Sequence, residues 1–319
     1  MNAGDTVPED ERFQVLVTWL YHVEGLTQGA IAEHLGVTRL KVNRALADAR
    51  RNGIVRISIH SRYAPCIDLA EELIDRFALK SASIAPAPSD DANVQPVIGT
   101  ELGLYLHRLL GDRAIKRMAV GWGNTLNHAA RAMTPISRPD MEIVSLMGSL
   151  PRGSDINSFE ITTKIADLLA AERSYLTAPL YAGTEQSRDT FMVQDVFQDV
   201  FVKLRQSDLY AIGVGDLTLK SLLVRDGLPR DVTADDLKRV GAVGDILGYF
   251  IDAEGKPIDH SITKRVVGVS PYELRGRSNV ILAAGGQHKV AVIGAALKTG
   301  IFDTLVTDER TARSILDAG

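Results

Sequence analysis

Apolar residues in the first fifty positions repeat at helical spacing in three short segments. Residues 13–23 place apolar side chains at i, i+3, i+4 and i+7, which predicts an amphipathic helix. Two further segments with an apolar side follow, and each opens on a residue that can cap a helix, Thr27 or Thr38. Gly36 lies in the turn between these two segments. Two short helices joined by a glycine-containing turn predict a helix-turn-helix.

The second of these helices is basic on its outer face. From Arg39 to Arg62 there are seven basic residues and one acidic residue, whereas the stretch from Asp5 to Glu33 is acidic. At 100° per residue, the basic positions fall opposite or beside the buried side, so they can face base edges and phosphates of DNA. A solvated basic face on an ordinary three-helix bundle is the alternative. The predicted DNA-binding residues are Thr27, Gln28, Thr38, Arg39, Lys41, Asn43, Arg44 and Arg51.

Beyond residue 62 the pattern alternates between strands and helices. Ser61 to Pro65 reads as the hinge, which divides the chain into domains 1–62 and 63–319. Such alternation predicts a mostly parallel sheet covered by helices on both faces, an α/β Rossmann-like doubly wound domain. The predicted strands are 83–84, 118–120, 142–147, 174–180, 209–214, 280–284 and 304–306. The predicted helices are 68–77, 94–110, 156–171, 194–205 and 290–297, with another after the glycine loop at 121–125 and one at the C-terminus.

Three glycine-containing loops follow strands of the predicted sheet. The first is Gly121-x-Gly123-x-Thr125, and the others are 213–216 and 284–289, which ends on Lys289. Ligands of such sheets bind beyond the carboxyl ends of the strands, and amides at a helix start suit an anion such as phosphate. A purely steric role for the glycines is the alternative. Equally, Thr125 can be only an N-cap and Lys289 only a solvated cation.

Composition limits the classes of function. The chain has 319 residues, 45% of them hydrophobic, and a net charge of −4, which fits a globular protein with a substantial core. Cys66 is the single cysteine, so an internal disulfide and a cysteine-built zinc site are excluded. No long apolar run and no secretory signal occur, which predicts a cytoplasmic protein without a membrane partner. The seven histidines lack metal-ligand spacing, so we expect no metal and no cofactor.

Several motifs, taken in order, resemble the SorC-type, sugar-responsive bacterial transcription regulators, which overlap with the deoxyribonucleoside-type regulators. The motifs are Leu26-Thr-Gln-x-x-Ile-Ala-x-x-Leu-Gly-Val-Thr-Arg39, Val42-Asn-Arg44, Gly53-Ile-Val55, Gly121-Trp-Gly-Asn-Thr125, Gly241-Ala-Val-Gly-Asp-Ile-Leu-Gly-Tyr-Phe250, Gly285-Gly-x-x-Lys289 and Leu305-Val-Thr-Asp-Glu-x-Thr-Ala312. The resemblance covers nearly the whole chain. It implies an effector domain similar in fold to glucosamine-phosphate and ribose-phosphate isomerases.

The resemblance also implies a function and a set of contacts. A phosphorylated sugar or polyol would bind the effector domain of a dimer or tetramer and alter oligomerisation or affinity for double-stranded operator DNA. Gly123, Asn124 and Thr125, with Gly121 before them, would hold the phosphate, and Lys289 would add positive charge. The segments around Arg152, Arg225 and Asp245 match the family more loosely. Family members often carry serine where this chain has Thr38 and Asn43, which bears on the operator that is read.

An enzyme is the competing interpretation: a sugar-phosphate isomerase or deaminase with a helical appendage. Such chemistry needs a positioned general base, for which Asp216 and Asp245 are the candidates. Carboxylates near a sugar also serve simply to accept hydrogen bonds from hydroxyls. The helix-turn-helix therefore favours a regulator that is not an enzyme. Arg265 reads equally well as a ligand contact or as a surface cation.

Overall fold

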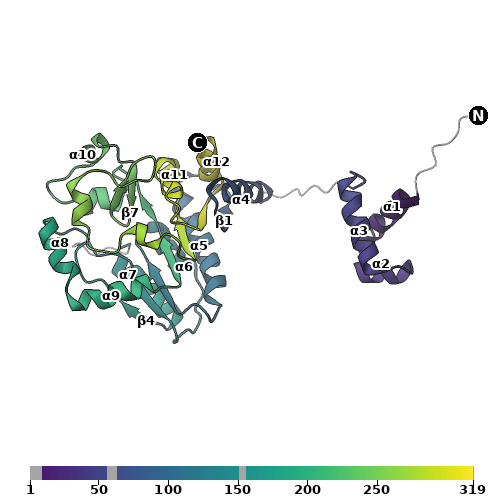
Figure 1. Cartoon of the computed structure of the whole chain (residues 1–319), viewed down its shortest axis with the longest axis horizontal. Helices are drawn as coiled ribbons and strands as arrows, with labels where there is room; N and C mark the ends of the chain where they lie inside the picture. The colour runs from purple at the N-terminus through teal and green to yellow at the C-terminus, as the bar shows by residue number, and fades with distance from the viewer. Residues whose placement is uncertain (1–8, 56–62, 151–155, 319) are drawn as a thin grey trace, which may run out of the picture. The chain divides into compact units, whose positions relative to one another are not determined.

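The computed structural model describes residues 9–55, 63–150 and 156–318. The chain separates into two compact units, Met1–Ser61 and Arg62–Gly319, called here the N-terminal and C-terminal units (Figure 1). In the described part of the chain, no helix is long and apolar enough to cross a membrane.

The N-terminal unit is built from α1 (Glu9–His22), α2 (Gln28–His34) and α3 (Arg39–Arg51), which confirms the predicted helices. Both predicted caps form, because Thr27 Oγ1 accepts a hydrogen bond from the Ala30 amide at 3.2 Å and Thr38 Oγ1 accepts one from the Lys41 amide at 3.3 Å. The three helices share one small apolar core. Its buried members are Val17, Leu20, Ile31, Ala32, Val42, Ala45 and Leu46.

The C-terminal unit contains a parallel sheet of seven strands among the described residues, in the order β1-β10-β9-β5-β2-β3-β4. The strands are β1 (Ser81–Ala85), β2 (Arg117–Val120), β3 (Glu142–Ser145), β4 (Glu172–Ser174), β5 (Leu209–Ile212), β9 (Val280–Ala283) and β10 (Thr304–Asp308). The chain runs outward from β2 to β3 and β4, then returns to β5 and runs outward the other way to β9 and β10. The crevice between the loops after β2 and β5 is therefore the topological switch point, where such sheets bind ligands.

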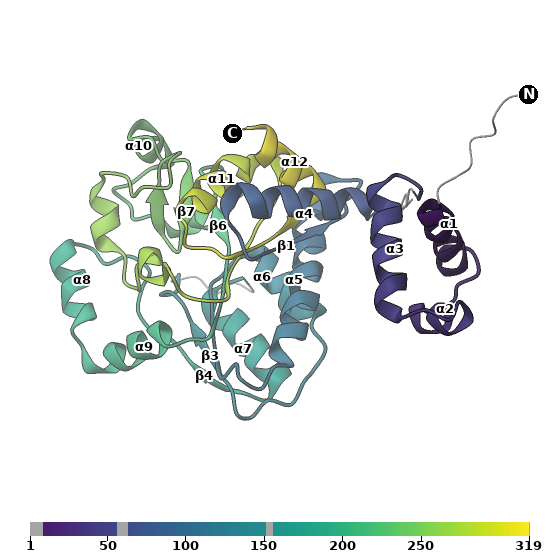
Figure 2. The same ribbon diagram turned by 45° about the vertical axis from the view of Figure 1, so that its right-hand side comes forward.

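Helices cover both faces of this sheet, as predicted. Alternate side chains of one strand enter opposite cores: Met118 and Val120 of β2 join one core, and Ala119 joins the other. The first core is covered by α5 (Val94–Leu110), α6 (Asn124–Ala132) and α7 (Ser158–Leu169). The second is covered by α4 (Ala64–Phe77), α9 (Asp195–Arg205), α11 (Val290–Lys298) and α12 (Glu309–Asp317). Figure 2 shows α4 beside α12, far from it in the sequence.

Two glycines let α5 and α6 pack very closely. A Cβ atom added at Gly99 would lie 2.3 Å from the Cβ atom of His128, and one added at Gly103 would lie 2.8 Å from the carbonyl oxygen of Ala129. Both distances are far shorter than a non-bonded contact allows. The position of α6, which begins at the glycine loop, is therefore fixed against α5.

A second, antiparallel sheet was not predicted. It consists of β6 (Val214–Gly215), β7 (Gly244–Ile246) and β8 (Tyr249–Ile251). The predicted strand 209–214 is divided, because Gly213 separates β5 from β6. The remaining helices are α8 (Glu185–Met192) and α10 (Ala234–Arg239). Shorter helical turns are η1 (Asp91–Asn93), η2 (Leu223–Gly227), η3 (Ser261–Arg265), η4 (Pro271–Leu274) and η5 (Gln287–Lys289).

The predicted strand 174–180 is wrong for most of its length. Only Ser174 belongs to a strand, the last residue of β4. The apolar alternation nevertheless predicted burial correctly, because the buried residues at alternate positions are Leu176, Ala178 and Leu180. Within the described residues 175–180, Pro179 is the one residue that forms a β-bridge, and its partner is Ser149. Proline lacks the amide that continuous strand pairing requires.

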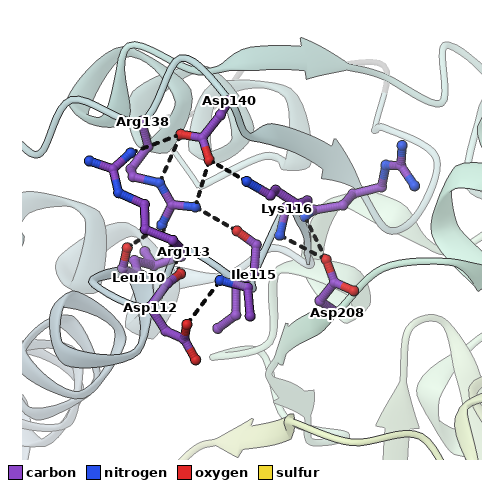
Figure 3. A network of polar contacts seen from close by, with 10 residues as sticks. Leu110, Asp112, Arg113, Ile115, Lys116, Arg138, Asp140 and Asp208 are labelled. Atoms are coloured by element: carbon purple, nitrogen blue, oxygen red, sulfur yellow. Dashed lines mark hydrogen bonds and ion pairs between the residues drawn. The ribbon is translucent and has the colours of Figure 1, made fainter.

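A polar network fastens the amino ends of three central strands (Figure 3). Arg138 is 1% exposed and donates hydrogen bonds to the carbonyl oxygens of Leu110 and Ile115 and to the carboxylate of Asp140. Hydrogen bonds from Arg138 and Lys116 hold the pKa of Asp140 well below its usual range. Asp208, just before β5, accepts the backbone amide of Lys116 at 2.8 Å. The network thus holds β2, β3 and β5 at the edge opposite the switch-point crevice.

Candidate functional site

A cavity of about 250 Å³ lies at the carboxyl ends of β2 and β5. It collects residues from segments far apart in the sequence, as the switch point predicts. The predicted residues that line it are Gly123, Asn124, Arg225, Asp245 and Lys289. The glycine loops add Trp122, Gly213 and Gly215 to this lining. Other lining residues, which the sequence did not single out, include Gln95, Ile156, Lys220 and Ser221.

The glycine loop presents the start of α6 to this cavity. Gly123 is the N-cap residue with φ +115°, in the region that favours glycine, and a Cβ atom there would meet nothing within 4 Å. The first amides of a helix have no partner within the helix, so those of α6 are available to an anion. Asn124 Nδ2 donates to Gln95 Oε1 at 2.7 Å, which joins the starts of α6 and α5.

Two predicted members of the loop do not line the cavity. Gly121 is buried behind it, and its amide donates to the Ala211 carbonyl oxygen of β5 at 2.9 Å. Thr125 is 6% exposed and lies in the first turn of α6. These positions build the loop, whereas Gly123 and Asn124 meet the cavity. Arg152 lies outside the described residues.

The opposite side of the cavity carries charged side chains that are largely shielded from solvent. Lys289, in η5, donates from Nζ to the Val214 carbonyl oxygen at 2.9 Å. Burial lowers the pKa of Lys289, whereas the nearby carboxylates of Asp216 and Asp245 act to raise it. A cation held in this way suits an anionic ligand, because the interaction between charges strengthens when water is excluded.

Asp245 is 3% exposed and belongs to β7, in the sheet that the sequence did not predict. Its Oδ2 accepts the amide of Gly248 at 2.9 Å. Burial raises the pKa of Asp245 to about 6, and Asp216 adds to this, while Gly248 and Lys289 oppose it. A Cβ atom on Gly215 would lie 2.2 Å from Asp245 Oδ1, so this close approach requires glycine at 215.

Lys220, Ser221 and Arg225 approach the cavity from the segment after β6. Arg225 is exposed, and its Nε donates to Asp226 Oδ2 at 2.8 Å. Lys220 is exposed, and Ser221 is 6% exposed. No repeat or motif marked Lys220 and Ser221 in the sequence, because their place beside the cavity follows from the small antiparallel sheet, which the sequence did not predict.

Arg265 is neither a surface cation nor a lining residue of this cavity. It is 8% exposed, and its guanidinium donates to the Ala182 carbonyl oxygen at 3.0 Å and to Asp231 Oδ2 at 2.8 Å. These contacts join η3 to the segments before α8 and α10. The buried arginine therefore has a structural role.

The N-terminal unit exposes the predicted basic side of α3. Exposed predicted side chains on this helix are Arg39, Lys41, Asn43, Arg44 and Arg51. Arg51 pairs with Asp48 at 2.5 Å, whereas Lys41 Nζ lies 4.9 Å from the ring centre of Phe13. Thr27, Gln28 and Arg39 line one shallow hollow at the start of α2. The fold thus brings predicted DNA contacts from α2 and α3 together.

Comparisons with known proteins agree with this two-unit arrangement. The family model described as "Putative sugar-binding domain" matches residues 61–317. The chain is 29% identical over 309 residues to the erythritol catabolism regulatory protein EryD of Brucella abortus, covering 96% of this chain and 97% of that protein. It is 32% identical over 321 residues to the transcriptional regulator LsrR of Klebsiella pneumoniae, covering 98% and 95%.

Solved structures give the same result. The full-length sorbitol operon regulator SorC from Klebsiella pneumoniae superposes with a TM-score of 0.72 at 25% identity, covering 97% of this chain and all of that one. A DeoR family transcriptional regulator from Listeria monocytogenes gives a TM-score of 0.71 at 24% identity, covering 78% and 99%, which supports the fold.

A helix-turn-helix unit followed by a doubly wound sugar-binding domain defines a sugar-responsive transcriptional regulator. The chain belongs to the SorC family of these regulators. The family predicted from the motifs is thereby confirmed, and so is the predicted role as a sugar-responsive regulator of transcription. The relatives are named as regulators of transcription and not as enzymes, which decides against the isomerase or deaminase interpretation.

Proposed function

We propose that this regulator binds a phosphorylated sugar or polyol in the cavity between the loops after β2 and β5. The observation that carries the proposal is the placement of the α6 start opposite Lys289 around one cavity. A phosphate needs convergent N–H donors together with a cation, and these two elements supply both. Lys220 and Arg225 add positive charge at the same cavity.

The remaining polar groups suit the sugar or polyol part of the ligand. Asp245 and Ser221 offer oxygen atoms, and Gln95 and Asn124 offer amides, so hydroxyl groups would find both donors and acceptors. Thr125 would contribute through its place in the first turn of α6. Two relatives are named for erythritol catabolism and for the sorbitol operon, which favours a polyol as the parent of the ligand.

The N-terminal unit would read an operator through α3. Arg39, Lys41, Asn43 and Arg44 lie at or near the amino end of this helix, where side chains reach base edges, and Arg51 is better placed for a phosphate. Paired half-sites require a homo-oligomer, a dimer or a tetramer, acting in the cytoplasm. The effector changes DNA affinity only as far as its own affinity differs between the DNA-competent state and the other state.

The proposal is tested by thermal unfolding of the full chain with a panel of sugars and polyols, each in phosphorylated and unphosphorylated form. A ligand that binds the folded state raises the unfolding temperature by mass action. We expect stabilisation by phosphorylated members only, without turnover. Equal stabilisation by an unphosphorylated sugar would overturn the phosphate assignment, and conversion of the ligand would restore the enzyme interpretation.

Two substitutions separate the two sites. We expect Arg44→Ala to weaken operator binding while the effector still binds. We expect Asn124→Ala, which removes an amide side chain that lines the cavity, to weaken effector binding while DNA binding without effector persists. If neither substitution changed DNA binding or its response to the ligand, the assignment of both sites would fail.

A further inference from the structure

Asp216, Asp245 and Lys289 form a group of charges beside the proposed effector cavity, called here the charge cluster. Asp216 is 2% exposed and Asp245 is 3% exposed. Asp216 Oδ2 accepts the amide of Thr218 at 3.1 Å, while its Oδ1 is buried without a hydrogen-bond partner among the described residues. The charge cluster thus has one ammonium group, Lys289, to balance the negative charges of two carboxylates, Asp216 and Asp245.

The surroundings of Asp245 offer little else to neutralise it. The groups around it come from separate elements: the Gly248 amide from the β7–β8 turn, Ser221 after β6, Asp216 beside it, and Lys289 from η5. Behind the turn, the Tyr181 hydroxyl donates to the Gly248 carbonyl oxygen at 2.6 Å. Lys220 and Arg225 are exposed at the cavity, where water screens their charges.

Burial disfavours the charged forms of both Asp245 and Lys289. The pKa of Asp245 is raised to about 6, and the pKa of Lys289 is lowered. The nearby ammonium acts to lower the pKa of Asp245. If the Lys289 ammonium also had to balance a further negative charge, the Asp245 carboxylate would take up a proton more readily.

We infer that binding of an anionic ligand at Lys289 is linked to the uptake of one proton from solvent by the Asp245 carboxylate. This inference rests on the proposed function, because it requires a phosphate group in the cavity. The incoming anion attracts the Lys289 ammonium, and the Asp245 carboxylate is left beside a second negative charge. The proton goes to Oδ1, because Oδ2 accepts the Gly248 amide. The resulting carboxylic acid donates to an oxygen of the ligand.

Effector affinity then depends on pH. Above the pKa of the free carboxyl, each unit of falling pH strengthens binding by up to about tenfold, the limit for one linked proton. A regulator with this property responds to its ligand more strongly in an acidified cell.

Inorganic sulfate is a suitable probe, because it keeps its charge between about pH 5 and 8 and every pH effect then comes from the protein. Binding of sulfate to the full chain is measured by titration calorimetry in two buffers of different ionisation heat, which gives the number of protons taken up. We expect an uptake approaching one proton near pH 7 and a dissociation constant that increases up to about tenfold per pH unit.

Two variants assign the proton. Asp245→Asn should bind sulfate without proton uptake and with little pH dependence. His288→Gln is the matched control, because His288 lies beside Lys289 on the same loop and histidine is the residue type that ordinarily changes charge near neutral pH. This control should keep the proton uptake of the original chain.

Binding of sulfate without proton uptake in the original chain would overturn the inference. So would loss of uptake in His288→Gln with retention in Asp245→Asn. If Asp245→Asn does not fold, infrared spectra of the original chain decide instead, since a protonated carboxyl band should appear when sulfate is added near pH 7 and its absence refutes the linkage. Failure of the proposed function is a distinct result: neither sulfate nor any phosphorylated polyol binds at any pH.

Discussion

The two units place their functional charges in opposite environments. In the N-terminal unit, one continuous helix, α3, carries the solvent-exposed side chains of Arg39, Lys41 and Arg44. In the C-terminal unit, Asp245 is buried, and Lys289, half-buried, reaches the same cavity from a different loop. Exposed charges can be removed with little effect on folding, whereas changes at the buried cluster alter stability and ligand binding together.

The largest effect is expected from Lys289→Met, which leaves Asp216 and Asp245 without their shared cation. Breaking a buried charge group by removing one partner costs about 3–4 kcal/mol, so unfolding by urea should occur at a much lower concentration. Stabilisation by phosphorylated polyols should disappear as well. Lys298→Met removes an exposed lysine farther along the same segment and should change stability by less than about 1 kcal/mol. Similar losses for both variants would contradict the contrast between buried and exposed charges.

Asp245→Asn should stabilise the protein, and only above a certain pH. The pKa of Asp245 is raised to about 6 in the folded chain, so the folded state binds more protons than the unfolded state between about pH 4 and 6. The contribution of this carboxyl to stability is greatest below that range and is lost as pH rises through it. Asparagine should therefore raise the free energy of unfolding by on the order of 2 kcal/mol near pH 7.5 and by almost nothing near pH 4.

Urea unfolding at both pH values measures this difference. Asp303→Asn provides a control that is distant from the cavity. The Asp303 carboxylate accepts the backbone amides of Asn279 and Val280. This substitution should destabilise the protein, since a carboxylate that accepts two amides is replaced. If Asp245→Asn raised the free energy of unfolding equally at both pH values, titration of this carboxyl would not be the cause.

Arg44→Ala should act on DNA binding and leave folding nearly unchanged. Loss of one arginine contact to DNA costs about 1–3 kcal/mol, which is roughly 5- to 150-fold in affinity. Fluorescence anisotropy with an operator selected from random duplexes measures the loss, and thermal unfolding should be unaltered. Lys238→Ala, which removes an exposed cation from α10, should leave DNA affinity as it was. Equal weakening by both substitutions would indicate a general charge effect.

The smallest effect concerns the cap of α3. Thr38→Ala removes the side-chain acceptor for the Lys41 amide and should destabilise the N-terminal unit by about 1 kcal/mol, whereas Thr38→Ser keeps the cap. Trp19 reports on this unit in a Trp122→Phe background, because the chain has two tryptophans. If serine and alanine were equally destabilising, loss of the methyl contact rather than of the cap would be the cause.

Local patterns allowed much of the fold to be predicted. Helical spacing gave 94–110, the bounds of α5, and the threonine caps gave the starts of α2 and α3. These features depend on residues only a few positions apart. The alternation at 174–180 was misleading, because a buried side chain alternates in the same way whether or not its backbone joins a sheet.

The candidate site was only partly predictable. Gly123 and Lys289 belong to motifs, and the rule for parallel sheets placed both at one edge. Lys220 and Ser221 reach the cavity through the small antiparallel sheet, whose strands have two or three residues each and leave no periodic trace. Thr125 fits the anion-loop pattern but is turned into the protein, a distinction that depends on the rotation of α6 against α5.

Gly99 and Gly103 have a mechanical consequence. They let the two helices pack without a gap, so we expect α5 and α6 to move together when a ligand displaces Asn124. Helix α5 spans about 25 Å from the cavity to Leu110, whose carbonyl oxygen accepts a hydrogen bond from Arg138. A side chain at either glycine would push the two helices apart, and we then expect a displacement at the cavity to reach Leu110 less directly.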